Sequence, residues 1–306
     1  MIKYKILSNL RELIALIIRL SGLTKLIYCL CARNKVSIIL YHNPDVEIFE
    51  RHMDYISKKY NFITLDTLVC AIESKDWSEI PRYPLVVTFD DGHKNNYKLL
   101  PVFEGFKVKP TIYLCTGIVN TSRHYWFTKA GSITQKLKSL PHQDRLEYLK
   151  TNEEFSLKRE YPSDTRQALS LTEMEEMKVS VNFEAHTQFH PILTTMDSGS
   201  SNNEIKSSRF GLDNFNLGVA DHFAYPNGDY TQREVSLCRD AGFRSARTID
   251  CGWNSKSTDL FRLKITGVSD NASVNILISQ LSGIPSFIRY LLKGSLIGRH
   301  KTILPN

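Results

Sequence analysis

Short apolar runs rich in β-branched residues alternate with helical patterns through most of the chain. The strand-like runs span residues 36–41, 85–90, 111–115, 179–185, 222–225, 243–248 and 263–268. Helical apolar spacing lies between them, at residues 48–59, 65–73, 97–104, 172–178, 203–214 and 232–240. Repeated strand–helix units of this kind predict an α/β fold, with a parallel sheet or barrel covered by helices.

Three segments follow from this pattern. We expect a basic amphipathic helical segment at residues 1–35, an α/β domain built on a parallel sheet or barrel at 36–270 and a basic, apolar segment at 271–306. Within this domain, residues 119–170 are polar and charged, with a helical pattern only around 143–151. A stretch of this length between elements is typically a functional cap or an insertion. We therefore predict a capping insertion at 119–170.

The excess of basic residues is concentrated at the two ends of the chain. The net charge is +7, yet residues 1–35 alone carry seven basic side chains and one acid, and residues 286–306 carry four basic side chains and no acid. The remaining body is mildly acidic, which argues against a nucleic-acid partner, because such proteins carry a basic stripe over the folded face. Basic ends mixed with Leu and Ile fit peripheral contact with an anionic membrane, or simply solvated termini.

The N-terminal segment predicts a helix with two different faces. Its apolar face would hold Leu7, Leu10, Leu13, Ile14, Ile17 and Ile18. Its polar face would hold Ser8, Arg11, Glu12, Ala15 and Arg19. In the window 13–32, Arg19 and Lys25 each cost about 2.5–3.5 kcal/mol in a bilayer, which cancels the gain from its Leu and Ile residues. The charges also interrupt the apolar run of a secretory signal. We expect an interfacial or core-docking helix, and a cytoplasmic protein at the inner face of the membrane.

Residues capable of metal or proton chemistry follow four of the predicted strands. They are His42 after the first strand, Asp90 and Asp91 at the end of the second, His186 and His190 after the fourth, and Tyr225 at the turn that ends the fifth. Because ligands gather at the carboxyl ends of parallel strands, these residues mark the candidate site.

The residue types at these positions suit hydrolysis assisted by a metal. Asp91, His186 and His190 offer one oxygen and two nitrogens, which leaves a position open for water, as in catalytic zinc sites. Asp90, beside the proposed ligand, could take a proton from water as general base. The turn at Tyr225 could offer backbone N–H groups to a developing oxyanion. The simpler alternatives are a helix N-cap for the two carboxylates, two structural histidines, and an ordinary turn.

Three motifs occur in a fixed order along the chain. They are Thr88-Phe89-Asp90-Asp91-Gly92, His186-Thr187-x-x-His190 and Phe223-Ala224-Tyr225-Pro226-x-Gly228. In order and spacing they resemble the NodB-homology polysaccharide deacetylases, carbohydrate esterase family 4, with looser likeness over about residues 36–268. The resemblance implies a distorted (β/α) barrel, here flanked by N- and C-terminal amphipathic helices. It also implies metal-dependent removal of acetyl groups from amino sugars in glycans.

The resemblance also implies a role for each motif residue. Asp90 would be the catalytic base, and the backbone of Tyr225 would donate to the oxyanion. Asp91, His186 and His190 would hold a divalent metal, with zinc expected and cobalt, nickel or another ion as alternatives.

The chain departs from the family pattern in two places. Ala224 stands where many members have the Arg that orients the base, and the late Leu-x-His motif that usually supplies the general acid is absent. His42 matches the Tyr-His of the poly-N-acetylglucosamine deacetylase-like subgroup, in which that His serves as the acid; the alternative is a hydrogen-bonded His at a strand end. Arg262 or Lys264 could replace an Arg that many relatives place before the last glycine.

The leading hypothesis is a metal-dependent hydrolase that removes acetyl groups from an amino sugar. Its partner would be an acetylated saccharide, part of a cell-surface polysaccharide or a lipid-linked glycan. Tyr125 and Trp126 could stack on sugar rings, although Trp126 could equally belong to the core. The alternatives are a catalytically degenerate glycan-binding or scaffold protein of envelope assembly, and an O-acetyl esterase.

Overall fold

The computed structural model describes residues 2–27, 32 and 34–284, so the predicted C-terminal segment lies outside the described residues from position 285 onward. The strands are β1 (Ser37–Tyr41), β2 (Asn61–Phe62), β3 (Pro84–Phe89), β4 (Thr111–Leu114), β5 (Asn182–Ala185), β6 (His222–Ala224), β7 (Ser245–Cys251) and β8 (Leu263–Gly267). The helices are α1 (Ile2–Leu20), α2 (Leu23–Ile27), α3 (Val46–Ser57), α4 (Leu65–Ser74), α5 (Leu100–Gly105), α6 (Trp126–Ala130), α7 (Thr134–Leu137), α8 (His142–Glu153), α9 (Leu171–Met177), α10 (Ser198–Phe215), α11 (Gln232–Asp240) and α12 (Val274–Leu281).

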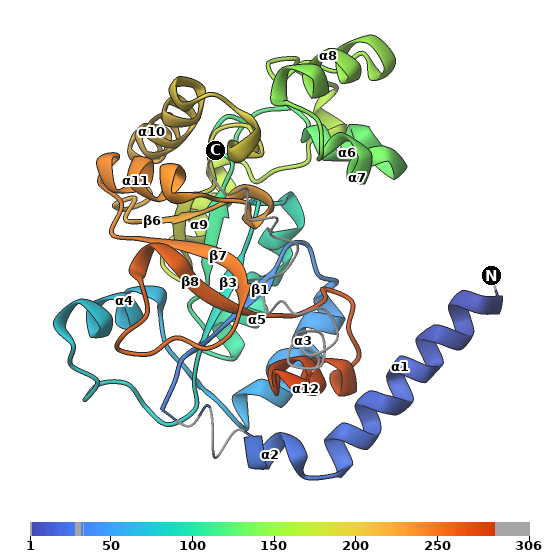
Figure 1. The fold of residues 1–306 in the computed structure, drawn as a ribbon, viewed down its shortest axis with the longest axis vertical. Helices are drawn as coiled ribbons and strands as arrows, with labels where there is room; N and C mark the ends of the chain where they lie inside the picture. The colour runs from blue at the N-terminus through green and yellow to red at the C-terminus, as the bar shows by residue number, and fades with distance from the viewer. Residues whose placement is uncertain (1, 28–31, 33, 285–306) are drawn as a thin grey trace.

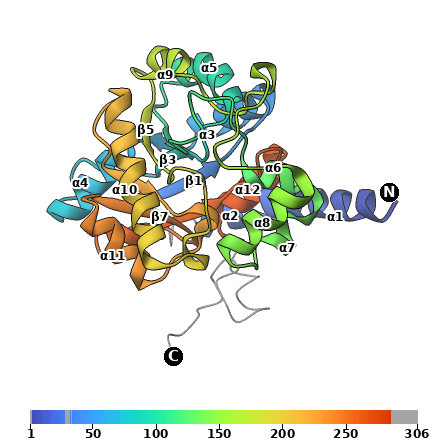
Figure 2. The ribbon, with the colours of Figure 1, turned by 90° about the horizontal axis from the view of Figure 1, so that it is seen from above.

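Seven parallel strands close into a barrel. The order is β1-β8-β7-β6-β5-β4-β3, and β3 pairs again with β1. β2 stays outside this ring, because it pairs with the first two residues of β3 on the edge that β4 occupies farther along. Seen from above, the strands lie at the centre and the helices surround them (Figure 2). The predicted α/β barrel is confirmed, and a shift of register in β7 between Arg247 and Cys251 contributes to its distortion.

The apolar runs form strands because both of their faces are covered. β1 and β3 are buried along their whole length, as expected of parallel strands that have helices outside and side chains inside. A cluster of aromatic rings, with centroids 5.2–5.7 Å apart, packs these strands against α3 and α5; it comprises Tyr41, Phe49, Phe89 and Phe103. This packing fixes the strand ends that carry the candidate site.

Several predicted boundaries differ from the structure. The strand expected at 179–185 begins only at Asn182, after a turn. The helix expected at 97–104 is divided into a 3-10 helix, Lys94–Leu99, and α5, because Pro101 lies in the first turn of a new helix. Residues 119–170 contain three helices, α6, α7 and α8, where the sequence indicated helix only around 143–151. α8 confirms that prediction, whereas α6 and α7, with five and four residues, are too short to show a helical period.

The two ends of the described chain meet outside the barrel. α1 packs against α12, which follows β8. Figure 1 shows α1 (dark blue) leaning away from the body at the lower right, well below α6–α8. None of the helices in the described ranges is long and apolar enough to cross a membrane.

Candidate active site

The hydrogen-bond ladders of the barrel continue one residue beyond the strands and aim the site residues inward. The Asp90 N–H donates to the Tyr41 carbonyl (3.0 Å), and the His186 N–H donates to the Leu114 carbonyl (2.9 Å). Asp90 directly follows β3, and His186 directly follows β5. Because the ladder hydrogen bonds still hold their backbones, these residues keep the extended direction of the strands. Their side chains meet at the carboxyl end of the barrel, where parallel α/β folds place their ligands.

Asp91, His186 and His190 come together at this end. All three are buried, and their potential ligand atoms lie within 4.8 Å of one another. Oδ1 of Asp91 is 3.3 Å from Nε2 of His190 and 3.6 Å from Nε2 of His186. This oxygen is buried and accepts no hydrogen bond from the described part of the chain. A buried carboxylate oxygen without a donor, facing two imidazoles, fits a divalent cation.

His186 is held in the tautomer that a metal requires. Its Nδ1 lies 2.8 Å from the carbonyl oxygen of Ala224 at the end of β6. A carbonyl oxygen can only accept a hydrogen bond, so Nδ1 carries the proton and Nε2 keeps its lone pair. Metal-binding histidines usually donate their second ring N–H in this way. The neighbouring strand therefore orients His186 toward Asp91.

His190 is kept neutral and fixed by its backbone. Burial lowers its pKa to about 4, although Asp91 acts in the opposite direction. Its φ angle of 56° lies in the left-handed region, which is uncommon for residues other than glycine, and hydrogen bonds on both sides hold the backbone there. The His190 N–H donates to Oγ1 of Thr187 (3.0 Å), and Nε1 of Trp126 donates to the His190 carbonyl (2.8 Å). At neutral pH the imidazole can therefore act as a ligand.

The second carboxylate oxygen of Asp91 contacts His93, a residue that was not among the candidate site residues of the sequence analysis. Oδ2 lies 3.2 Å from Nε2 of His93. Burial would raise the pKa of Asp91, but His190, His93 and His186 outweigh burial and hold that pKa below its ordinary value. The alternative of a helix N-cap is wrong, because the following 3-10 helix begins after His93 and has no side-chain cap. Gly92 has a φ of 74°, a left-handed conformation in which a side chain would be strained.

Asp90 is paired with an arginine from the opposite part of the barrel. Nη2 of Arg247, on β7, contacts both carboxylate oxygens of Asp90, at 2.6 Å for Oδ2, and the Arg247 side chain is fully buried. An arginine from the next strand therefore contacts Asp90, where the sequence analysis found none at Ala224. The two residues named for the other missing arginine, the one before the last glycine, lie elsewhere: Arg262 donates to Gln232 at the surface, and Lys264 is exposed.

A buried glutamate holds the loop between the two histidines. Oε2 of Glu204, on α10, accepts from the N–H groups of Gln188 (2.9 Å) and Phe189 (3.1 Å). Burial raises the pKa of Glu204, and these two hydrogen bonds partly offset the shift. The sequence offered no signal for this contact, because Glu204 sits in a polar helical stretch. Its effect is to fix the path of the chain from His186 to His190.

The site opens into a cavity of about 390 Å³. It is lined by Leu40, His42, Asp90, Asp91, Trp126, Phe127, Thr134, Lys138, His190, Asn227, Gly228 and Ile249. His42 therefore lies at the same cavity as Asp90 and Asp91. Its backbone is clamped, because Asp270 accepts from the N–H of His42 (3.0 Å) and Asn96 donates to its carbonyl (2.9 Å).

Tyr225 is not placed as the sequence analysis expected. Its N–H donates to the Arg247 carbonyl (3.1 Å) within the β6–β7 ladder, and its hydroxyl donates to the Phe261 carbonyl (3.2 Å). The ladder runs one residue past β6 and uses the N–H that was expected to face an oxyanion. The chain reaches the cavity only at Asn227 and Gly228.

Residues 119–170 form one wall of the cavity. Trp126, Phe127, Thr134 and Lys138 all line it, and Nζ of Lys138 donates to Oδ1 of Asn227 (2.5 Å). The expectation that Tyr125 stacks on a sugar is wrong, because its ring is fully buried and its hydroxyl donates to the Asp91 carbonyl. Trp126 is also buried, at 2% exposure, in a small apolar cluster formed mainly by residues 119–170, from which its Nε1 reaches the His190 carbonyl.

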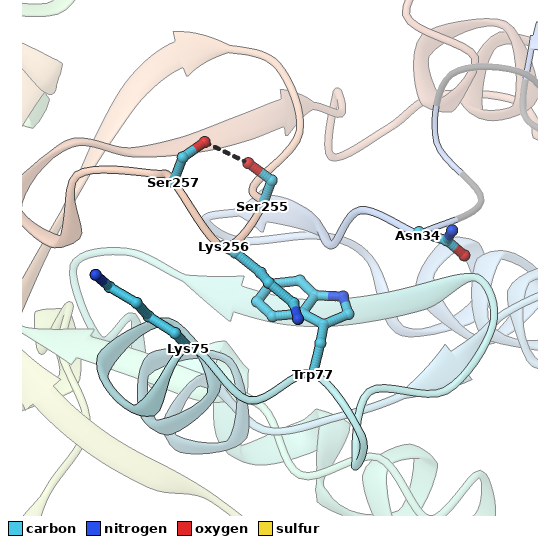
Figure 3. Close-up of a pocket in the computed structure, with 6 residues that line it drawn as sticks. All are labelled: Asn34, Lys75, Trp77, Ser255, Lys256 and Ser257. Atoms are coloured by element: carbon cyan, nitrogen blue, oxygen red, sulfur yellow. Dashed lines mark hydrogen bonds between the residues drawn. The ribbon is translucent and has the colours of Figure 1, made fainter.

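A second hollow, of about 820 Å³, lies near the amino ends of β1 and β3. Figure 3 shows its lining residues, Asn34, Lys75, Trp77, Ser255, Lys256 and Ser257, with the two serine hydroxyls facing each other at 3.2 Å. Its lining contains no carboxylate, imidazole or thiol. The residues suited to hydrolysis therefore lie in the smaller cavity at the carboxyl ends.

Comparison with known proteins assigns the central part of the chain to a family. Residues 79–246, more than half of the sequence, match the model of a family described as polysaccharide deacetylase. This range contains Asp90, Asp91, His186 and His190. No curated protein sequence matches the chain significantly.

Solved structures with a similar fold cover most of the chain. The deacetylase PplD of Streptococcus pyogenes, solved with acetate, has 19% identity and a TM-score of 0.60 over 81% of this chain and 99% of its own. IcaB from Ammonifex degensii has 16% identity and a TM-score of 0.60 over 81% and 97%. The deacetylase domain of BpsB from Bordetella bronchiseptica has 15% identity and a TM-score of 0.55 over 77% and 96%. At these identities the likeness concerns the fold.

Proposed function

The chain belongs to the polysaccharide deacetylase family, and from this premise we propose that it is a metal-dependent hydrolase that removes acetyl groups from an amino sugar. One observation supports the proposal above the others: Oδ1 of Asp91 and the imidazoles of His186 and His190 converge in a buried cluster beside Asp90. The cluster provides two nitrogens and one oxygen, the donor set of a catalytic site that keeps a position open.

The proposed metal ligands are Asp91, His186 and His190. When bound, a divalent ion supplies positive charge that polarises the acetyl carbonyl and lowers the pKa of a water molecule. Zinc is our first expectation from the mixed nitrogen and oxygen donors, and cobalt or nickel would suit the same set. The chain itself contributes the orientation: Ala224 fixes the tautomer of His186, and Glu204 fixes the loop that carries His190.

Asp90 is the proposed general base. Its carboxylate lies beside the cluster, with Oδ2 3.8 Å from Nε2 of His186, where it can accept the proton of the attacking water. Nη2 of Arg247 contacts both oxygens of that carboxylate, and Nη1 donates to the Thr248 carbonyl (3.2 Å), so the guanidinium is itself held in place and makes charge-assisted contacts with the base. This contact supports an active enzyme over the binding-only alternative, which rested on a missing arginine and a missing late histidine.

His42 is the proposed general acid. It lines the cavity with Asp90, and Asp270 and Asn96 clamp its backbone, so its imidazole can deliver a proton to the departing amine. For the oxyanion we propose the backbone N–H of Asn227 in place of Tyr225. Asn227 lines the cavity, whereas the N–H groups of Tyr225 and Gly228 already donate to carbonyls.

We further propose that the substrate belongs to a cell-surface polysaccharide or a lipid-linked glycan, processed at the inner face of the membrane. The family supports an acetylated saccharide as the substrate. The basic, apolar residues 1–35 support a membrane location, and the cytoplasmic leaflet is the one with the more negative surface.

Acetate release tests this function. The purified full chain, loaded with zinc, is incubated with N-acetylated oligosaccharides, with their O-acetylated counterparts and with lipid-linked N-acetylated sugars, with and without a chelator. We expect release from N-acetyl substrates that the chelator abolishes and added zinc restores. Asp90→Asn should keep the metal but lose about 10²-fold or more in turnover. Release from O-acetyl substrates alone would favour the esterase, and no release from any substrate by the metal-loaded protein would overturn the assignment.

A further inference from the structure

Seven large apolar side chains of α1 and α2 are exposed to solvent. With exposed fractions between 41% and 74%, they are Leu10, Leu13, Ile14, Ile17, Leu20, Leu23 and Leu26, here termed the α1–α2 apolar face. In the rest of the described chain, the exposed large apolar residues are Val179, Phe210 and Val219. A contiguous apolar face of this kind on a helix marks a contact surface.

α1 docks on the protein through its polar side. Glu12 accepts hydrogen bonds from Ser273 Oγ (2.6 Å) and Asn275 Nδ2 (2.7 Å), and Arg19 Nη1 donates to Asn275 Oδ1 (2.8 Å). Ala15, between them on the helix, is 3% exposed. At about 100° per residue, positions 12, 15 and 19 form one stripe.

The apolar positions 10, 13, 14, 17 and 20 lie on the opposite side of α1 from that stripe. A helix that serves only the protein core buries its apolar face and exposes its polar one. α1 shows the reverse, and the hydrogen bonds to the region around α12 hold its apolar face outward.

We propose that the α1–α2 apolar face binds the surface of an anionic lipid membrane. The sequence of these two helices is basic, since it contains Lys3, Lys5, Arg11 and Lys25, and the Arg11 side chain is exposed. The one acid in residues 1–35 is Glu12, which is turned toward α12. Basic charge next to apolar side chains matches anionic headgroups over acyl chains. A second copy of the chain fits less well, because two equally basic faces repel each other.

The shape of the molecule suits a helix lying in the membrane plane. The 19 residues of α1 extend over about 28 Å at 1.5 Å per residue, and Figure 1 shows the helix standing clear of the barrel. The inference deepens the membrane location proposed above by naming the surface that binds, and it does not depend on the proposed activity, because vesicle binding requires no turnover.

Vesicle sedimentation tests the proposal. The full chain is mixed with vesicles of phosphatidylcholine alone, or of phosphatidylcholine with phosphatidylglycerol, at low and high salt. We expect binding to the anionic vesicles that weakens as salt screens the basic residues. The double variant Leu13→Glu with Ile17→Glu should bind about tenfold more weakly or worse. Leu13→Ser with Ile17→Ser, which adds no charge, should also lose binding.

The matched control is Val179→Glu with Phe210→Glu, which adds the same charge at exposed apolar sites far from α1 in the sequence. This variant should bind vesicles as the parent chain does, and thermal unfolding should show all variants folded. Failure of the parent chain to bind anionic vesicles at low salt would overturn the proposal. An equal loss of binding in the control would do the same. A dimer in light scattering that only the α1 variants dissociate would assign the face to a second copy instead.

Discussion

The contact between Arg247 and Asp90 joins two residues that are 157 positions apart and both buried. A buried ion pair is costly to desolvate, but losing one partner is costlier, at about 3–5 kcal/mol, because the other charge is left alone. Stability alone therefore does not explain why this ion pair is buried at the site. Here Arg247 presents its guanidinium to both oxygens of Asp90, which we propose as the base.

Replacing Arg247 by Lys should keep the charge and lose the planar guanidinium. Lysine carries one nitrogen, which cannot contact Asp90 and the Thr248 carbonyl from the positions of Nη2 and Nη1. We therefore expect Arg247→Lys to fold and to release acetate about 10²-fold more slowly, with metal content unchanged. The matched control is Arg262→Lys, at an arginine that donates to Gln232 at the surface, which should behave as the parent chain. Equal rates for both variants would contradict a positioning role for Arg247.

Single-residue roles could be predicted from the sequence only where a motif carried them. Asp90, Asp91, His186 and His190 each follow a strand, and the barrel gathers such positions at one end. The contact of Arg247 with Asp90 could not be predicted, because it depends on how the barrel closes and not on any local pattern. The motif pointed to Tyr225 as the oxyanion donor. Its spacing does not reveal that the ladder between β6 and β7 continues one residue past the strand and uses the Tyr225 N–H.

At the scale of elements, α10 supports the loop that carries both histidines. Glu204→Gln removes the charge that binds the N–H groups of Gln188 and Phe189. We expect zinc affinity, measured by competition with a chelating dye, to fall about 10–100-fold, as for other residues that orient metal ligands. Lys206→Gln, an exposed change on the same helix, should leave affinity unchanged. An unaltered affinity in Glu204→Gln would show that the loop needs no such support.

The helix α8 should respond to mild acid. Burial, with Arg145 nearby, lowers the pKa of His142 to about 4, so the unfolded chain binds this proton more tightly than the folded one. This contribution to stability is therefore complete above about pH 6.5 and is lost as the pH falls toward 4. Between pH 7 and pH 4.5, we expect the thermal unfolding midpoint of His142→Gln to fall by less than that of the parent chain. Equal losses would contradict this assignment.

Among the elements, long strands and the longer helices were predictable, and very short elements were not. β1 and β3 appear as unbroken apolar runs because both of their faces are buried. β2 has two residues, and α6 and α7 have five and four, which is too short for a period to be recognised. The two-sided pattern of α1 predicted an amphipathic helix, but only the contacts with Ser273 and Asn275 show which face points outward.

At the scale of the molecule, the proposed ligands come from two strands and a loop, so a bound metal would link distant parts of the barrel. A ligand that binds only the folded state stabilises it, by about 2.7 kcal/mol at a hundred times its dissociation constant. We expect added zinc to raise the thermal midpoint by a few degrees and a chelator to reverse this. The variant His186→Ala with His190→Ala should show no such rise, and a rise equal to that of the parent chain would place the effect elsewhere.

The most direct measurement is the zinc content of the purified chain after equilibrium dialysis, determined by elemental mass spectrometry. For the parent chain and for Asp90→Asn, we predict about one tightly bound ion per molecule, as expected of a site with three protein ligands. His186→Ala with His190→Ala should retain almost none. A parent chain that binds no ion, or a double variant that binds as much as the parent, would contradict the proposed metal centre.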